Sequence, residues 1–272
     1  MAELACAMAA IHLPSLLSAP DRLTEAQWSA IRGGFASLRE TLLAHEVDTV
    51  VVISDEHFNT LDPRCYPAFG VVTGRSARGP VERWLGMPRG SVEVTLESSL
   101  ADTVLERGLA EGFDLTRLGG IQLDHGFLTC LHFMTPQWDL RYVWLIQNCV
   151  LAPLPSVRRA YEFGEMVGRA IRSWKSSQRV AVLGTGGLSH WVGTPEAGRI
   201  DEAFDRRVLG LLEENGPALR SLTHEELDAA GNGAHEIRNW IAAAGAAGGR
   251  GEVVMYEPVA GCGSGMMRWQ VA

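Results

Sequence analysis

Three residues of the chain belong to the types that hold a catalytic divalent metal ion: His12, His57 and Glu236. Two neutral imidazoles and one carboxylate on one face of a metal leave about three open positions, which is the arrangement of non-haem Fe(II) oxygenases. The same three ligands would equally suit a catalytic zinc ion with a bound water. Spacing does not choose between the two metals, so both stay open at this point.

Two further histidines are candidates for proton transfer. His190 ends the segment 184–190, Gly-Thr-Gly-Gly-Leu-Ser-His, in which glycines let the backbone approach a ligand closely. A histidine in such a cleft suits general acid–base chemistry. His125, in the segment Leu-Asp-His-Gly, is a second candidate, either as a proton donor or as a hydrogen-bonding partner of the substrate. The glycine segment lacks a lysine and matches neither phosphate-binding fingerprint, so we do not expect it to bind phosphate.

Each candidate also has an ordinary structural explanation. A single histidine after a strand is most often a hydrogen-bonded structural residue, and Glu236 alone is typical of an acid in the first turn of a helix. Asp55, Glu56 and Asp124 could orient the metal-binding histidines from behind, or be solvated turn acids. The remaining histidines lie at expected helix ends or in an apolar run and are interpreted as structural: His45, His132, His224 and His235.

The expected strands give the histidines a common location. Residues 48–53, Asp-Thr-Val-Val-Val-Ile, form a continuous β-branched run that is typical of a strand covered on both faces. His12, His57, His125 and His190 each follow the C-terminal end of an expected strand, and open α/β sheets bind ligands at that edge. The expected strands are residues 4–11, 48–53, 117–123, 142–146, 179–183, 253–256 and 266–271. The pattern therefore predicts one shared site.

Helical patterns alternate with these strands. Helices are expected at residues 24–44, 96–111, 157–174, 200–215, 223–229 and 234–247, and a glycine- and proline-containing loop at residues 73–92. The alternation predicts an α/β fold with a central, mostly parallel or mixed sheet flanked by helices. No repeat or linker divides the chain, so we expect residues 1–272 to form a single domain.

Composition excludes several classes of protein. The formal net charge is −8 and no basic run occurs, which argues against a nucleic-acid partner. No stretch reaches the roughly 18 apolar residues that cross a membrane. The 5 cysteines are widely spaced and include no Cys-x-x-Cys pair, so we expect reduced thiols in a cytoplasmic protein.

Taken together, these segments resemble the class III extradiol ring-cleavage dioxygenases, the family that includes the catalytic β subunit of protocatechuate 4,5-dioxygenase and 2,3-dihydroxyphenylpropionate 1,2-dioxygenase. The resemblance spans nearly the whole chain, and the ordered combination of segments is more specific than any one of them. The segments that carry it are residues 11–15, 57–69, 123–126, 184–190, 193–204 and 234–240.

The resemblance implies a role for each candidate residue. It implies Fe(II) held by His12, His57 and Glu236, with His190 as the acid–base residue and His125 as a second active-site histidine. It further implies an oxidoreductase of aromatic catabolism that opens a catechol-type ring and incorporates both atoms of O2. A zinc-dependent hydrolase, a DOPA-type relative with another metal and a non-catalytic partner subunit on the same scaffold are the alternatives.

Substrate and assembly follow from the resemblance only in outline. Residues 193–204 are similar to the protocatechuate-type subunit and favour a carboxylated catechol or a gallate-like ring, while bulkier biaryl diols stay open. Residues 261–265, Gly-Cys-Gly-Ser-Gly, would offer backbone donors to a substrate carboxylate or form a plain turn. The family implies a homo-oligomer or a heteromer with a small second subunit. One departure is that Glu56, with Asp55 one residue earlier, stands where many relatives have aspartate before the second metal histidine.

Overall fold

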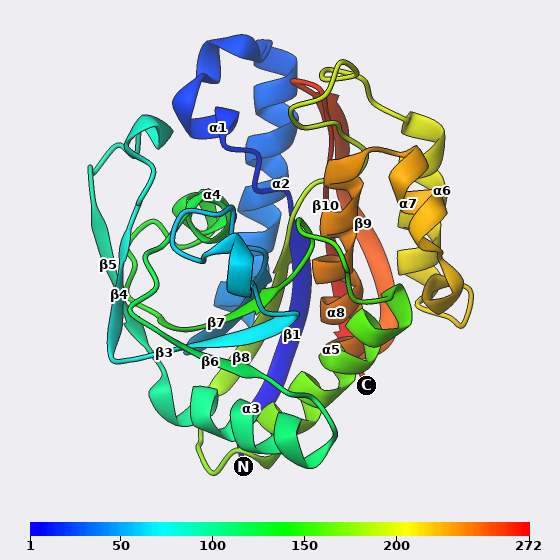
Figure 1. The fold of residues 1–272 in the computed structure, drawn as a ribbon. Coiled ribbons are helices and arrows are strands. Elements are labelled where there is room, and N and C mark those ends of the chain that lie inside the picture. Colours follow the sequence, from blue (N-terminus) through cyan, green and yellow to red (C-terminus); the bar gives the residue numbers. More distant parts are fainter.

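A ten-stranded mixed sheet forms the centre of the protein, with helices on both faces (Figure 1), and the α/β fold expected from the sequence is confirmed. The computed structural model describes residues 1–272. The strands are β1 (Glu3–Ala10), β2 (Thr49–Ser54), β3 (Phe69–Thr73), β4 (Ser76–Gly79), β5 (Val92–Leu96), β6 (Thr116–Gly119), β7 (Arg141–Gln147), β8 (Arg179–Thr185), β9 (Gly248–Val259) and β10 (Cys262–Val271). The helices are α1 (Ser15–Ser18), α2 (Glu25–Ala44), α3 (Ser98–Ala110), α4 (His125–Met134), α5 (Val157–Ser173), α6 (Glu202–Glu214), α7 (His224–Ala229) and α8 (Ile237–Ala247).

The middle of the sheet brings three chain segments to one edge. Its strand order is β4-β5-β7-β2-β8-β1-β10-β9, and β1, β8, β2 and β7 run parallel to one another. The register pairs Ala10 of β1 with Thr185 of β8, and Ile53 of β2 with Gly184 of β8. Because parallel strands end at the same edge, the residues that follow β1, β2 and β8 leave the sheet side by side.

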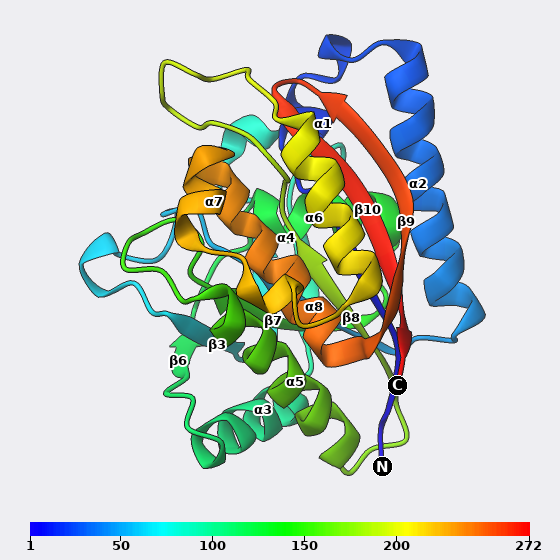
Figure 2. The same cartoon turned by 90° about the vertical axis from the view of Figure 1, so that its right-hand side faces the viewer.

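Helices cover the two faces of the sheet (Figure 2) and enclose one apolar core on each. One core of 37 buried residues lies under α2 and α4, and another of 45 lies under α3, α5, α6 and α8. The start of α2 is fixed by a capping box, in which Thr24 and Gln27 satisfy each other's backbone N–H groups. No helix of the structure is long and apolar enough to cross a membrane.

The pair α5 and α8 is packed unusually closely. Every residue of α8 is buried, and the helix is rich in alanine and glycine, so its backbone approaches α5 directly. A Cβ atom at Gly164 of α5 would lie only 1.8 Å from the carbonyl oxygen of Ala242. Close backbone packing therefore fixes α8, whose first residue directly follows Glu236.

Three sequence expectations about the elements are wrong. Residues 73–92 are not a plain loop, because they contain β4 and the first residue of β5, and α3 begins at Ser98 rather than at residue 96. The helix α4 was not expected at all. Its residues are buried nearly all round, so it shows no polar face and no helical period. His125 is consequently the first residue of a helix, not the residue after a strand.

The glycine segment near the C-terminus differs from its expected form as well. Gly261 has a φ of 78° and makes the turn between β9 and β10, while residues 262–265 already belong to β10. The N–H group of Gly263 donates to the Ser189 carbonyl, so it is not free to bind a substrate carboxylate. The segment instead joins β10 to the chain that carries His190.

The close contact of α5 with α8 predicts a large effect of one added methyl group. We expect Gly164→Ala to lower the free energy of unfolding by about 1–3 kcal/mol, because overpacking forces the two backbones apart. Gly210→Ala in α6 is the matched control, since no atom lies within 4 Å of the added Cβ. There we expect a gain of about 0.5–1 kcal/mol from helix propensity. Chemical denaturation measures both, and equal stability of the two variants would contradict this account.

Candidate metal centre

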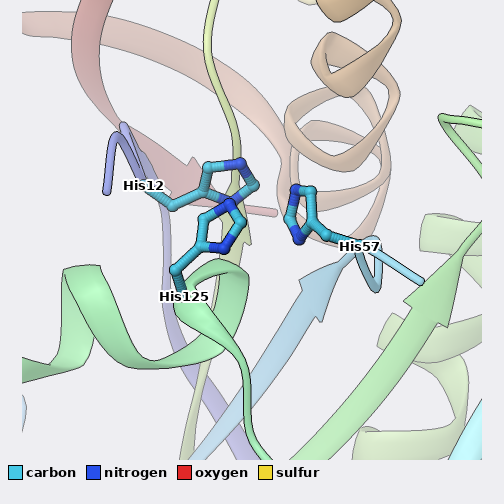
Figure 3. Close-up of side chains that lie close together, drawn as sticks. All are labelled: His12, His57 and His125. Atoms are coloured by element: carbon cyan, nitrogen blue, oxygen red, sulfur yellow. The ribbon is translucent and has the colours of Figure 1, made fainter. Parts of the chain in front are cut away.

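Three histidines from distant parts of the chain face one another at the edge of the sheet (Figure 3). His12 follows β1, His57 lies in the loop after β2, and His125 begins α4. The ring centroids of His57 and His125 are 3.9 Å apart, and that of His12 lies 5.1 Å from the first and 5.5 Å from the second. The structure thus brings together three of the residues that the sequence pattern singled out.

Glu236 closes the cluster from the last residue before α8. Its Oε2 lies 3.1 Å from His12 Nε2, and its Oε1 lies 3.9 Å from His57 Nε2. The Gly187 N–H group donates to Oε2 at 2.6 Å and holds the carboxylate in place. Gly186 has a φ of 149°, and a Cβ there would lie 2.7 Å from Glu236 Cβ. The glycines after β8 therefore make room for the carboxylate.

Two of the histidine rings are held by hydrogen bonds at Nδ1, so the Nε2 atom of each ring is directed at the centre. The Thr185 hydroxyl donates to the Gly126 carbonyl at 2.8 Å, so it accepts from His12 Nδ1 at 3.1 Å. His57 Nδ1 donates to Asp124 Oδ2 at 2.8 Å. Such support from behind is usual for metal-binding histidines, because it fixes the tautomer and the ring orientation. Each Nε2 is thereby left to bind a proton or a cation.

The donor atoms fit a divalent metal ion. Ligand atoms of His12, Asp55, His57 and Glu236 all lie within 4.8 Å of one another. His57 Nε2 is buried and has no hydrogen-bond partner in the protein. Bonds of about 2.1 Å, usual for divalent ions with nitrogen and oxygen, place neighbouring octahedral ligands about 3.0 Å apart. The separation of 3.1 Å between His12 Nε2 and Glu236 Oε2 is close to that spacing.

Charges in the cluster favour a cation strongly. Burial alone would lower the pKa of His57, but the carboxylates of Asp55 and Asp124 raise it well above its usual range. Burial would raise the pKa of Asp124, yet the charge and hydrogen bond of His57 lower it. Burial would likewise raise the pKa of Glu236, and the neighbouring His12 and His190 lower it well below normal. A metal ion entering this centre would displace protons from its ligands.

His190 lies beside the cluster without belonging to its closest set of donor atoms. Its Nδ1 donates to the Leu188 carbonyl at 2.9 Å, and its Nε2 lies 3.6 Å from Glu236 Oε1. Burial opposes the charge on His190, but Cys262 and Glu236 outweigh it and raise its pKa well above the usual value. A Cβ at Gly233 would lie 2.1 Å from His190 Nε2, so only glycine fits there. Nε2 is thus the atom placed to exchange a proton.

His125 is held by an acid that sequence reasoning missed. Glu82, which is buried, accepts from His125 Nδ1 at 2.5 Å and from the His125 backbone N–H group at 2.7 Å. Burial and the charge of His57 lower the pKa of His125. Glu82 comes from the region that was expected to be a loop, and no local pattern marks it. Its pairing with His125 is visible only once β4 and α4 are in place.

The three acids that were candidates for orienting histidines have different roles. Asp124 accepts hydrogen bonds from two groups of His57, the backbone N–H group at 3.0 Å and the ring Nδ1. Glu56 instead accepts the backbone N–H groups of Asn59 and Thr60, both at 2.7 Å, and shapes the loop. The carboxylate directly before His57 therefore does not contact its ring, whereas Asp55 does approach it.

Comparison with known proteins gives consistent matches over most of the chain. Residues 6–267 match the family model described as the catalytic LigB subunit of aromatic ring-opening dioxygenase. The 2,3-dihydroxyphenylpropionate/2,3-dihydroxicinnamic acid 1,2-dioxygenase of Klebsiella pneumoniae (strain 342) is 27% identical over 260 residues, covering 78% of this chain and 80% of that protein. The enzyme of the same name from Burkholderia vietnamiensis is 29% identical over 254 residues, covering 76% and 78%.

A solved structure shares the fold. The crystal structure of an uncharacterized protein from Escherichia coli K12 superposes with a TM-score of 0.63 and covers 97% of this chain and 99% of that one. Only 15% of the aligned residues are identical, so the similarity concerns the arrangement of the sheet and helices.

The hydrogen bond from His57 Nδ1 to Asp124 predicts the effect of removing the charge of Asp124. We expect Asp124→Asn to weaken binding of a divalent ion by about 10–100-fold, because the amide no longer fixes the tautomer of His57. Competition with a chelator measures the affinity, and circular dichroism checks that α4, which Asp124 caps, is retained. Asp62→Asn, which removes a carboxylate paired with the exposed Arg64, is the control that should bind like the unmodified protein. Unchanged affinity in a folded Asp124→Asn variant would contradict the assigned support.

Proposed function

The chain belongs to the family of catalytic LigB subunits of aromatic ring-opening dioxygenases, and from this we propose that it is an Fe(II)-dependent extradiol dioxygenase of substituted catechols. The observation that carries the proposal is the convergence of His12, His57 and Glu236, whose donor atoms meet at the sheet edge. We also propose that residues 1–272 act as one catalytic domain, since the family match covers residues 6–267 and one sheet runs through the chain.

Ring opening with O2 favours iron over zinc in this centre. Two histidines and one carboxylate with open positions are the usual ligands of non-haem Fe(II) oxygenases. When bound, Fe(II) would hold the two diol oxygens and supply the redox chemistry that reaction with O2 requires, which zinc lacks. The zinc hydrolase considered from sequence loses its support, because the family opens aromatic rings with oxygen.

The residues around the centre supply the proton transfers. We assign His190 Nε2 as the atom that exchanges a proton with the reacting oxygen atoms, since Nδ1 is committed to the Leu188 carbonyl. Such general acid–base catalysis contributes about 10²–10⁴-fold to the rate. We assign His125, held by Glu82 on the other side of the cluster, as a second histidine that hydrogen-bonds the reacting oxygen atoms. Its Nδ1 is committed to Glu82, so Nε2 is the atom left for that hydrogen bond.

Exposed apolar side chains near the centre favour a substituted ring as substrate. Phe58, Trp84 and Val192 are 43%, 58% and 59% exposed, although large apolar residues are usually buried. Phe58 directly follows His57, Val192 lies two residues after His190, and the Trp84 ring centroid is 6.0 Å from that of His125. We propose that they contact an apolar part of the substrate beyond the diol. Both bacterial relatives are named for catechols that carry a side chain.

The proposed activity predicts a defined assay result. After anaerobic loading with Fe(II), we expect oxygen uptake and a yellow ring-opened product from catechols, with one O2 consumed for each diol. A panel of catechol, 2,3-dihydroxyphenylpropionate, protocatechuate and a biaryl diol should give the highest kcat/KM with the rings that carry an apolar substituent. Zinc-loaded protein is the control and should be inactive. Failure of every diol to consume oxygen with Fe(II) bound would refute the function, and a preference for protocatechuate would refute the apolar contact.

Replacing His190 separates proton transfer from metal binding. We expect His190→Ala to keep Fe(II) at the stoichiometry of the unmodified protein while kcat falls by about 10²–10⁴-fold, because the acid–base group is lost. His45→Ala, at the end of α2, is the control histidine and should leave both quantities unchanged. Stoichiometric loss of iron from His190→Ala would show that His190 is a ligand instead.

A further inference from the structure

Asp55 is a buried carboxylate that the roles assigned above do not use. It is the first residue after β2, two residues before His57, and it has no exposed surface. Its Oδ1 accepts a hydrogen bond from Asn239 Nδ2 at 3.1 Å. Its Oδ2 has no hydrogen-bond partner in the protein. A buried carboxylate oxygen without a partner is costly, so its surroundings should contain a compensating charge.

The free oxygen of Asp55 points at the proposed metal centre. Oδ2 lies 3.2 Å from His57 Nε2, yet neither atom makes a hydrogen bond. His57 Nδ1 donates its hydrogen bond to Asp124. His57 Nε2 and Asp55 Oδ2 are therefore two possible metal-ligand atoms that face the same space. Their separation is close to the roughly 3.0 Å expected for neighbouring ligands of one divalent ion. The same spacing relates His12 Nε2 to Glu236 Oε2, at 3.1 Å.

A buried network orients Asp55 toward the centre. Asn239 Nδ2, besides donating to Asp55, donates to the Thr185 carbonyl at 3.0 Å, and Asn239 Oδ1 accepts from Gln147 Nε2 at 3.1 Å. Asp55, Asn239, Thr185 and Gln147 all have no exposed surface. Asn239 lies three residues after Glu236, so the start of α8 positions both carboxylates. The network holds Oδ1 and thereby aims Oδ2 at the centre, while no protein hydrogen bond ties Oδ2 itself.

We propose that Asp55 is a fourth protein ligand of the metal ion in the substrate-free enzyme, next to His12, His57 and Glu236. The proposal rests on the metal centre of the proposed function. Two carboxylates balance the charge of a divalent ion, which accounts for two acids buried at one point. Four protein ligands leave two of about six positions open, so a diol that binds through both oxygens together with O2 requires Asp55 to leave. Asp55 would then limit reaction with O2 until a diol has bound.

Cobalt(II) tests this assignment without relying on turnover. In Asp55→Asn we expect Co(II) to bind more weakly by more than the roughly 10–100-fold that loss of an outer partner costs, and the visible Co(II) spectrum to change. Asp55→Cys should place a thiolate on the ion and add a strong thiolate-to-cobalt absorption band in the near ultraviolet. Glu56→Gln and Glu56→Cys are the matched controls, since Glu56 is the adjacent buried acid and its carboxylate accepts only from loop backbone N–H groups. Both controls should keep the spectrum of the unmodified protein.

The outcomes separate this inference from the proposed function. If Asp55→Asn binds Co(II) with the unmodified affinity and spectrum, or if stoichiometric Co(II) in Asp55→Cys gives no thiolate band, Asp55 is not a ligand although the centre stands. Should Asp55→Cys fail to fold by circular dichroism, the spectrum of Asp55→Asn decides. If the unmodified protein binds no Co(II), the metal centre and the ligand role of Asp55 both fail. Addition of a catechol should bring the spectra of unmodified protein and Asp55→Asn together, and a persistent difference would refute displacement.

Discussion

The concentration of negative charge at one buried point is the constraint on which the rest of the structure depends. Asp55, Asp124 and Glu236 are all buried within reach of the same histidines. Carboxylates in such surroundings are stable only when cations or hydrogen-bond donors compensate them. Asp124 is compensated by the imidazole and backbone of His57, and Glu236 by a backbone N–H group and by His12. Asp55 is hydrogen-bonded through one oxygen only, by Asn239, so a cation in the middle would complete its compensation.

The sheet makes this concentration possible at little conformational cost. The parallel strands β1, β2 and β8 end together, so His12, His57 and the glycine segment before His190 leave the same edge in a fixed register. The start of α8 lies against Gly184 and Gly186 at that edge. Its close packing on α5 fixes the position from which the Glu236 carboxylate contacts His12. Because the donors lie just past strand ends and at the start of α8, the centre can be formed before a metal ion arrives.

The parts of the site that the sequence predicted well are those with a local signal. The β-branched strand before His57 and the apolar run before His12 each predict a strand followed by a polar side chain, and the structure has both. The placement of His125 was wrong in its element, because α4 is buried nearly all round and its apolar run carries no helical period. Glu82 had no signal at all, because its partner is 43 residues away and meets it only through tertiary packing.

The same distinction explains why the role of Asp55 is invisible in the sequence. Beside His57 it is one of two consecutive acids, and Glu56 occupies the position directly before the histidine. Both acids follow the end of β2, and their hydrogen-bond partners turn one carboxylate toward the loop and the other toward the centre. Glu56 caps backbone N–H groups of the loop, whereas Asp55 meets Asn239 of α8, 184 residues away. A helix distant in sequence thus selects which of two neighbouring acids faces the metal site.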